Sequence, residues 1–155
     1  MQRPITLIDV HRLRITERTD PERELEVVRE LVRAGVWSHP ISVERRLKAI
    51  MDGHHRYRAA LLLGLSRVPC VLYDYTEVRV TPRRIGVDIR PDEILRRARE
   101  RDPYPAKTTR HVFPDATLEC RVALDELRDN AFQGRHRLVW CRAEPSSLRF
   151  AAGAT

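Results

Sequence analysis

The feature that most constrains the fold of this chain is a glycine turn that joins a short apolar run to an apolar helix. The run is residues 49–51, the turn is Asp52-Gly53, and the helix extends over residues 54–63. A strand that turns on a glycine directly into a helix leaves the first backbone N–H groups of that helix without partners. These groups and the positive end of the helix dipole predict a binding site for an anion.

The same turn carries four basic side chains and one acid, His54, His55, Arg56, Arg58 and Asp52. The basic groups suit phosphate oxygens, and Asp52 suits Mg²⁺ or the orientation of a hydroxyl group. Two adjacent histidines are hard to explain by packing, because neighbouring side chains on a helix point in different directions. The pattern therefore favours a phosphate-handling site over an ordinary helix start, where charged residues are also common.

Length and charge limit the class of protein. The 155 residues fit one compact domain, and a net charge of +7 favours phosphates or nucleic acid as partners without choosing between them. The three cysteines, Cys70, Cys120 and Cys141, are isolated, which favours free thiols in a reducing cytoplasm over disulfides or a zinc site. We see no signal peptide and no apolar run of membrane-spanning length, so we expect a cytoplasmic protein with no membrane partner.

Hydrophobic periodicity predicts a mixed α/β domain. We expect strands over residues 5–10, 40–43, 47–51, 68–73 and 78–80, and helices over residues 22–34, 54–63, 91–101 and 122–132. The first helix has Asp20 as its N-cap, Pro21 as its first residue and Gly35 at its end. Its apolar stripe consists of Leu25, Val27, Val28, Leu31 and Val32, and the 54–63 helix is apolar on most sides and expected to be buried.

Two motifs together resemble a known family. The segment Asp-Gly-His-His-Arg-Tyr-Arg-Ala-Ala at residues 52–60, with Pro40-Ile41 before it and residues 68–71 after it, resembles the nucleotide-binding core of the ParB/sulfiredoxin fold. ParB proteins usually carry Gly-Glu-Arg-Arg at this turn, whereas the present version is similar to the free L-serine kinases of the same superfamily. A second element, Pro-Ala-Lys-Thr-Thr-Arg-His at residues 105–111, is similar to the Pro-x-Lys-Thr-Thr-Arg-His element of these kinases. It follows the rigid connection at residues 102–105, and we expect it to form a loop.

The resemblance implies a single ParB/sulfiredoxin-like α/β domain over residues 1–155, with a small mixed sheet and flanking helices. The nucleotide-binding core is about residues 5–75, the substrate element is about residues 103–113, and residues 124–155 stay unplaced. The implied activity is an Mg²⁺-dependent kinase that transfers a phosphoryl group from ATP or ADP to the hydroxyl of free L-serine, or a close analogue such as threonine. The product, O-phosphoserine, would enter amino-acid biosynthesis.

The resemblance also implies roles for individual residues. The catalytic carboxylate matches Glu17, although Asp20 and Glu22 remain candidates, and Asp20 is better explained as a helix cap. Asp52 is the other catalytic group and the metal ligand. The nucleotide and phosphate site comprises Pro40, Gly53, His54, His55 and Arg56. The amino-acid substrate site comprises Lys107, Thr108, Thr109, Arg110, His111 and Trp37, where Trp37 either lines the pocket or packs on the first helix.

Two other functions remain open at this point. A ParB-like DNA-binding or regulatory module fits the basic charge, but we see no clear helix-turn-helix after residue 75, where ParB proteins carry theirs. A nucleotide hydrolase or switch on the same fold would not need the element at residues 107–111. The sequence does not choose between ATP and ADP, between serine and threonine, or between oligomeric states.

Overall fold

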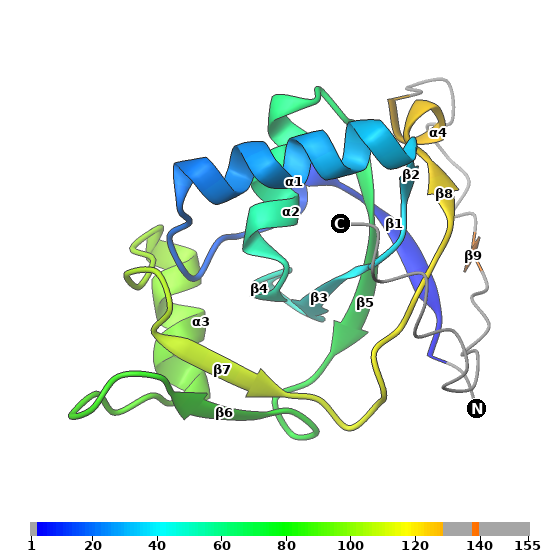
Figure 1. The fold of residues 1–155 in the computed structure, drawn as a ribbon. Coiled ribbons are helices and arrows are strands. Elements are labelled where there is room, and N and C mark those ends of the chain that lie inside the picture. Colours follow the sequence, from blue (N-terminus) through cyan, green and yellow to red (C-terminus); the bar gives the residue numbers. More distant parts are fainter. Residues whose placement is uncertain (1–2, 129–137, 140–155) are drawn as a thin grey trace.

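The computed structural model describes residues 3–128 and 138–139, and its centre is a mixed five-stranded sheet (Figure 1). The strand order is β4-β3-β5-β1-β9, with β1 at Ile5–Asp9, β3 at Ile41–Glu44, β4 at Ile50–Asp52, β5 at Arg67–Tyr73 and β9 at Leu138–Val139. Strand β3 runs parallel to β5, and the remaining neighbours in the sheet are antiparallel. The predicted mixed α/β class is confirmed.

Two smaller sheets flank the main one. Strand β2 (Val36–Trp37) pairs with β8 (Val122–Ala123), and β6 (Arg79–Pro82) pairs with β7 (Thr109–Val112). Both pairings correct the sequence analysis. The helix predicted over residues 122–132 does not begin at residue 122, because that residue pairs with Trp37. The second motif is not a loop throughout, because residues 109–112 pair with β6.

The first helix, α1 (Pro21–Ala34), begins and ends as predicted. An Asp20 side-chain oxygen accepts the backbone N–H of Glu22 at 3.0 Å, and Gly35 closes the helix with a φ of 70°, which favours glycine. The predicted apolar stripe is wrong in part, since Leu25 and Val32 are 49% and 58% exposed. The buried face is formed by Glu24, Val27 and Leu31. This face therefore does not coincide with the middle of the predicted apolar stripe.

The other helices are η1 (Val10–Arg12), α2 (His54–Leu62), α3 (Pro91–Glu100) and α4 (Leu124–Arg128). Helix α2 packs beneath α1 (Figure 1), but only Ala59 and Ala60 are fully buried in it, and Leu62 is 56% exposed. The prediction that this helix is buried on most sides is therefore wrong. Two alanines let α2 approach its neighbours closely on one face, and the polar residues of the turn lie in its N-terminal half. The predicted continuation of α4 to residue 132 lies outside the described residues.

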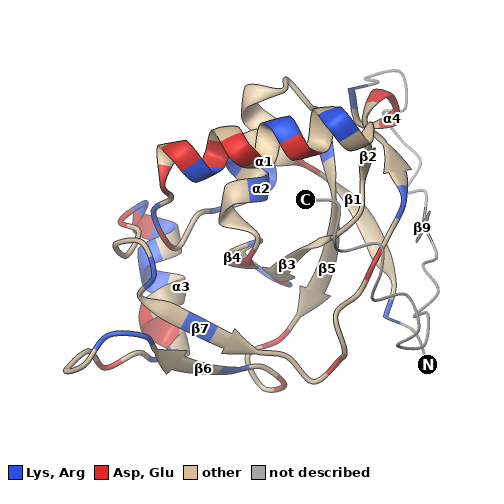
Figure 2. Cartoon of the chain, in the orientation of Figure 1, with Lys and Arg blue, Asp and Glu red and all other residues tan. Residues whose placement is uncertain are grey.

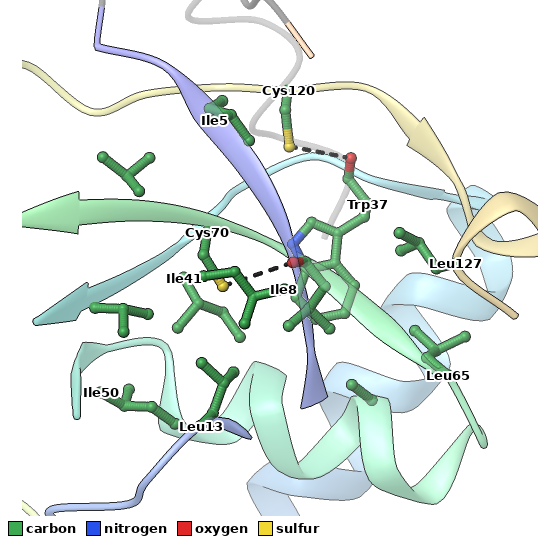
Figure 3. Close-up of a cluster of buried hydrophobic side chains, with 14 of the residues drawn as sticks. Ile5, Ile8, Leu13, Trp37, Ile41, Ile50, Leu65, Cys70, Cys120 and Leu127 are labelled. Atoms are coloured by element: carbon green, nitrogen blue, oxygen red, sulfur yellow. Dashed lines mark hydrogen bonds between the residues drawn. The ribbon is translucent and has the colours of Figure 1, made fainter. Parts of the chain in front are cut away.

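The main core lies between the large sheet and helices α1 and α2 (Figure 3). Trp37, Ile41 and Ile50 have no exposed surface, and full burial of such side chains stabilises a fold by roughly 1.5–3 kcal/mol each. Cys70 and Cys120 are both buried, Cys70 is a free thiol as predicted, and Cys141 lies outside the described residues. No helix within residues 3–128 is both long and apolar enough to cross a membrane.

Candidate active site

The carboxylate of Glu17 lies against the second motif, 90 residues away in the chain. Its Oε1 accepts the backbone N–H of Lys107 at 2.6 Å, and its Oε2 accepts the backbone N–H and the hydroxyl of Thr109 at 3.1 and 2.9 Å. A β-bridge between Glu17 and Tyr104 joins the same two segments. The tertiary structure thus brings together the predicted catalytic glutamate and the predicted substrate element.

The local conformation of the second motif makes these contacts possible. Lys107 has a φ of 57°, a left-handed conformation that costs an L-residue roughly 1–2 kcal/mol, and the turn presents the N–H groups of Lys107 and Thr109 to one carboxylate. The buried hydroxyl of Thr108 closes the turn by donating to the Pro105 carbonyl at 2.6 Å. Thr108 therefore supports the turn from behind and does not face Glu17.

The two adjacent histidines hold the loop that carries Glu17. The Nε2 atom of His54 accepts the backbone N–H groups of Thr16 and Glu17 at 3.1 and 3.2 Å, and the Nε2 atom of His55 accepts that of Asp20 at 3.1 Å. An accepting ring nitrogen carries no proton, so both rings are neutral in this arrangement. Burial, with the nearby rings of His111 and His55, lowers the pKa of His54 to about 3, and burial also lowers the pKa of His55.

The interpretation that packing does not explain adjacent histidines is therefore wrong. At the start of a helix, two neighbouring rings point in different directions and reach two different parts of one irregular loop. Their contacts with phosphate stay predictions, while their contacts with the loop give them a positioning role. The same geometry favours Glu17 over its alternatives, since Asp20 is engaged as the N-cap of α1.

Gly53 and Arg56 shape the turn before α2. Gly53 has a φ of 104°, and an added Cβ would lie 3.1 Å from Nη2 of Arg56 and 3.2 Å from Cγ1 of Ile41. Arg56 donates from Nη1 to the carbonyls of His39 and Pro40 at 2.6 and 2.9 Å, and from Nη2 to Asp52 at 3.3 Å. Pro40 thus contributes a carbonyl that anchors Arg56, and the guanidinium pairs with Asp52 beside the helix N-terminus.

The charges of Asp52 and His111, which belong to two different motifs, interact. The Asp52 side chain is 64% exposed at the end of β4. Burial lowers the pKa of His111 to about 4, and the negative charge of Asp52 acts in the opposite direction. His111 also forms a hydrogen bond of 2.9 Å with the Tyr75 hydroxyl.

The site therefore lies between the ends of β4 and β7. Residues 109 and 111 share one face of β7, because side chains alternate along a strand. Thr109 reaches Glu17 from this face, and the charge of Asp52 acts on His111. Alternation places the exposed Arg110 on the opposite face, so the structure does not bring it to Glu17. Trp37 is a core residue with no exposed surface (Figure 3), which corrects its placement in the substrate site.

Most of the residues that surround Glu17 carried no signal in the sequence, and Arg58 is the exception. A cleft of about 260 Å³ borders Glu17, and its other lining residues are Ile15, Arg18, Thr19, Glu24 and Arg58. The hydroxyl of Thr19 donates to Glu24, and Arg58 pairs with the same carboxylate at 3.4 Å. An isolated threonine such as Thr19 is common in any chain, so only its contacts in the fold indicate a role for it.

Within residues 3–128, no group of three His, Cys, Asp or Glu side chains is arranged to hold a metal ion. Asp52 nevertheless fits Mg²⁺, because this ion commonly binds one or two carboxylates together with substrate phosphates and water. A carboxylate that is 64% exposed beside a helix N-terminus has room for such a shared ion.

Comparisons with known proteins bear on the fold of the chain. No protein-family model matches the chain. A ParB-like protein of Sulfolobus acidocaldarius is 39% identical over 67 residues, which are 43% of this chain and 34% of that protein, so the match spans about a third of the relative's length.

Solved structures match over most of the chain. A free serine kinase in complex with AMP superposes with a TM-score of 0.74 at 14% identity, over 82% of this chain and 95% of that chain. SbnI from Staphylococcus aureus, with a C-terminal truncation, gives a TM-score of 0.72 at 14% identity over 81% and 90%. A conserved hypothetical protein from Pyrococcus furiosus gives 0.71 at 14% identity over 82% and 98%.

The chain therefore has the fold of the free serine kinase structures. This is the ParB/sulfiredoxin-like fold that the two sequence motifs predicted.

Proposed function

We propose that this protein is a kinase for a free amino acid, which transfers a phosphoryl group from ATP or ADP to the hydroxyl of L-serine or a close analogue such as threonine. The observation that carries the proposal is the position of Glu17. Its carboxylate is held by Lys107 and Thr109, on a loop anchored by a histidine from the helix that follows Asp52. Three motifs that are distant in sequence thus meet around one carboxylate.

Glu17 is suited to orient the attacking hydroxyl and accept its proton. Phosphoryl transfer depends on positioning and on charge stabilisation, and a carboxylate commonly orients the nucleophile. Each oxygen of a carboxylate accepts two hydrogen bonds in its plane. Oε1 receives one donor, which leaves a position for the substrate hydroxyl, whereas Oε2 already receives two from Thr109. Oε1 is therefore the atom that we assign to proton transfer.

The turn at Asp52-Gly53 is suited to hold the nucleotide phosphates. The absence of a Cβ at Gly53 lets the Arg56 guanidinium lie close to the turn, and α2 has no side-chain cap on its N-terminal N–H groups. Bound Mg²⁺ would neutralise phosphate charge, and Asp52 would hold it together with phosphate oxygens. Free serine kinase structures that contain AMP and ADP support a nucleotide site on this fold.

The second candidate is a ParB-like DNA-binding or regulatory module without kinase activity. The 39% identical segment of a ParB-like protein and the net charge of +7 favour it. Such a module would need the phosphate-binding turn but would have no use for a carboxylate held beside the second motif.

The direct test is to incubate the protein with Mg²⁺, either ATP or ADP, and each of L-serine, L-threonine and L-homoserine, and to detect phosphorylated amino acids by mass. We expect a product with at least one hydroxy amino acid and none with L-alanine. Nucleotide binding without a phosphorylated product from any of them would reject the kinase and favour the regulatory module or a hydrolase. A parallel measurement of nucleotide hydrolysis separates these last two.

A further inference from the structure

A larger cleft adjoins the candidate active site and shares Ile15 and Arg58 with the small cleft beside Glu17. Its volume is about 540 Å³, and four segments form it, namely residues 11–15, residues 46–48 in the β3–β4 connection, residues 57–58 of α2 and residues 98–101 at the end of α3. Six cationic side chains and no carboxylate line this basic cleft, and the cations are Arg12, Arg14, Arg46, Lys48, Arg58 and Arg101.

Most of these cations have no internal counter-charge. Arg58 pairs with Glu24 at 3.4 Å, whereas the other five form no ion pair with any carboxylate of residues 3–128. Helix α3 shows the contrast, since acidic and basic residues lie side by side along it (Figure 2) and its arginines at 96 and 97 are both paired. Like charges gathered around one cleft repel one another, and a bound anion removes this repulsion.

The backbone beneath the cations is held in place. The Glu44 carboxylate accepts the N–H groups of Arg46 and Leu47 at 2.8 and 2.6 Å. The N–H of Arg14 donates to the Lys48 carbonyl at 2.9 Å, and the Arg14 carbonyl accepts from Ile50 at 2.8 Å. The positions from which these side chains extend are thus fixed before any ligand arrives, which reduces the entropic cost of binding.

We propose that this basic cleft binds a small polyanion with two or more phosphate groups, at a site separate from Glu17 and Asp52. A volume of about 540 Å³ is in the range of small-molecule sites, and guanidinium groups match phosphate oxygens in paired geometry. Five uncompensated cations require several negative charges within a short distance, which one carboxylate does not supply. Cations that surround a cleft favour a compact ligand over nucleic acid, whose phosphates follow an extended path.

The test uses inorganic triphosphate as the probe, titrated into the full chain by calorimetry at physiological salt. The cleft variant is Arg46→Gln with Arg101→Gln, and the matched control is Arg29→Gln with Arg33→Gln, which removes the same charge from exposed positions on α1. We expect the cleft variant to lose at least about tenfold in affinity, since two charge-assisted contacts are removed, and the control to change by less than about twofold. Thermal unfolding of both variants checks that each one folds.

Four results would overturn the proposal. Equal losses in the cleft variant and the control would show a general charge effect. Absence of triphosphate binding to the native protein would show that the cleft does not bind such a polyanion. Displacement of triphosphate by ADP in a one-to-one competition would assign the cleft to the nucleotide of the kinase reaction. Preferential binding of a single-stranded or duplex oligonucleotide, weakened by the cleft variant, would make this a nucleic-acid surface.

Discussion

The loop at residues 16–20 and the basic cleft differ in how their polar groups are satisfied. In the loop, Glu17 accepts three hydrogen bonds, and the rings of His54 and His55 accept backbone N–H groups. In the basic cleft, five cations have no carboxylate partner among residues 3–128. The polar groups of the loop are used to hold the loop in its conformation, whereas the cations of the basic cleft remain available to bind a ligand. Substitutions in the loop should therefore change turnover, and substitutions in the cleft should change ligand binding alone.

The largest effect is expected from Glu17→Gln. The amide keeps the shape of the side chain but cannot take the proton of the substrate hydroxyl, so the rate should fall by roughly 100- to 10,000-fold. Nucleotide affinity should change little, because the Glu17 carboxylate contacts the second motif, and the contact with His54 after Asp52 is made by the backbone N–H, which the substitution keeps. Product formation and calorimetry with ADP measure the two effects, and Glu26→Gln on the exposed face of α1 is the control. If the variant kept the activity of the parent, Glu17 would not be the catalytic carboxylate, and Asp20 and Glu22 would be the remaining candidates.

The next effect is expected from Asp52→Asn, which should lower the rate by about 100-fold or more if this carboxylate holds the metal. The fold should survive, since the Asp52–Arg56 pair is 3.3 Å long and its carboxylate is mostly exposed. The measurement is the rate as a function of Mg²⁺ concentration, with thermal unfolding in parallel. A variant whose Mg²⁺ dependence matches that of the parent would place the metal elsewhere.

Acid should loosen the loop region. The pKa of His54 is about 3 and that of His111 is about 4 in the fold, against an ordinary value of 6.5. Between these values the unfolded chain binds protons that the folded chain does not, so stability falls as the pH drops below about 6.5, by up to roughly 1.4 kcal/mol per pH unit for each histidine.

Urea unfolding at pH 7.5 and pH 5 measures this difference. The variant His54→Gln should lose less stability than the parent between the two values, because one of the two groups is gone. The exposed His11→Gln serves as the control and should behave like the parent. If His54→Gln and the parent lost the same stability between the two pH values, protonation of His54 would not be a cause of the loss.

The smallest effect is expected from Thr109→Val. This change removes the hydroxyl that donates to Glu17 at 2.9 Å and keeps the backbone N–H donor at 3.1 Å. One such bond contributes about 1 kcal/mol, so the rate should fall about three- to tenfold, and Thr109→Ser should restore it. Equal rates for the valine and serine variants would show that the hydroxyl does not help to position Glu17.

Local signals predicted the parts of the fold that depend on neighbours in sequence. Asp20, Pro21 and Gly35 mark the ends of α1 because capping and a positive φ involve residues within one turn. The strand order around β5 and the pairing of Trp37 with Val122 were not predictable in this way, since each joins segments far apart in the chain. The burial of Trp37 follows from that pairing, and for this reason its side chain is absent from the site.

The sequence by itself determined which chemical groups the site contains, through the turn at residues 52–58, the element at residues 105–111 and the resemblance that singled out Glu17. Only the tertiary structure decided what those groups do to one another. It places Glu17 on the N–H groups of Lys107 and Thr109, and it gives His54 and His55, the two histidines predicted to bind phosphate, contacts that hold the Glu17 loop. The physical reason is that a hydrogen bond depends on distance and direction between atoms, and for residues 37 or 90 positions apart these are set by the packing of the whole domain.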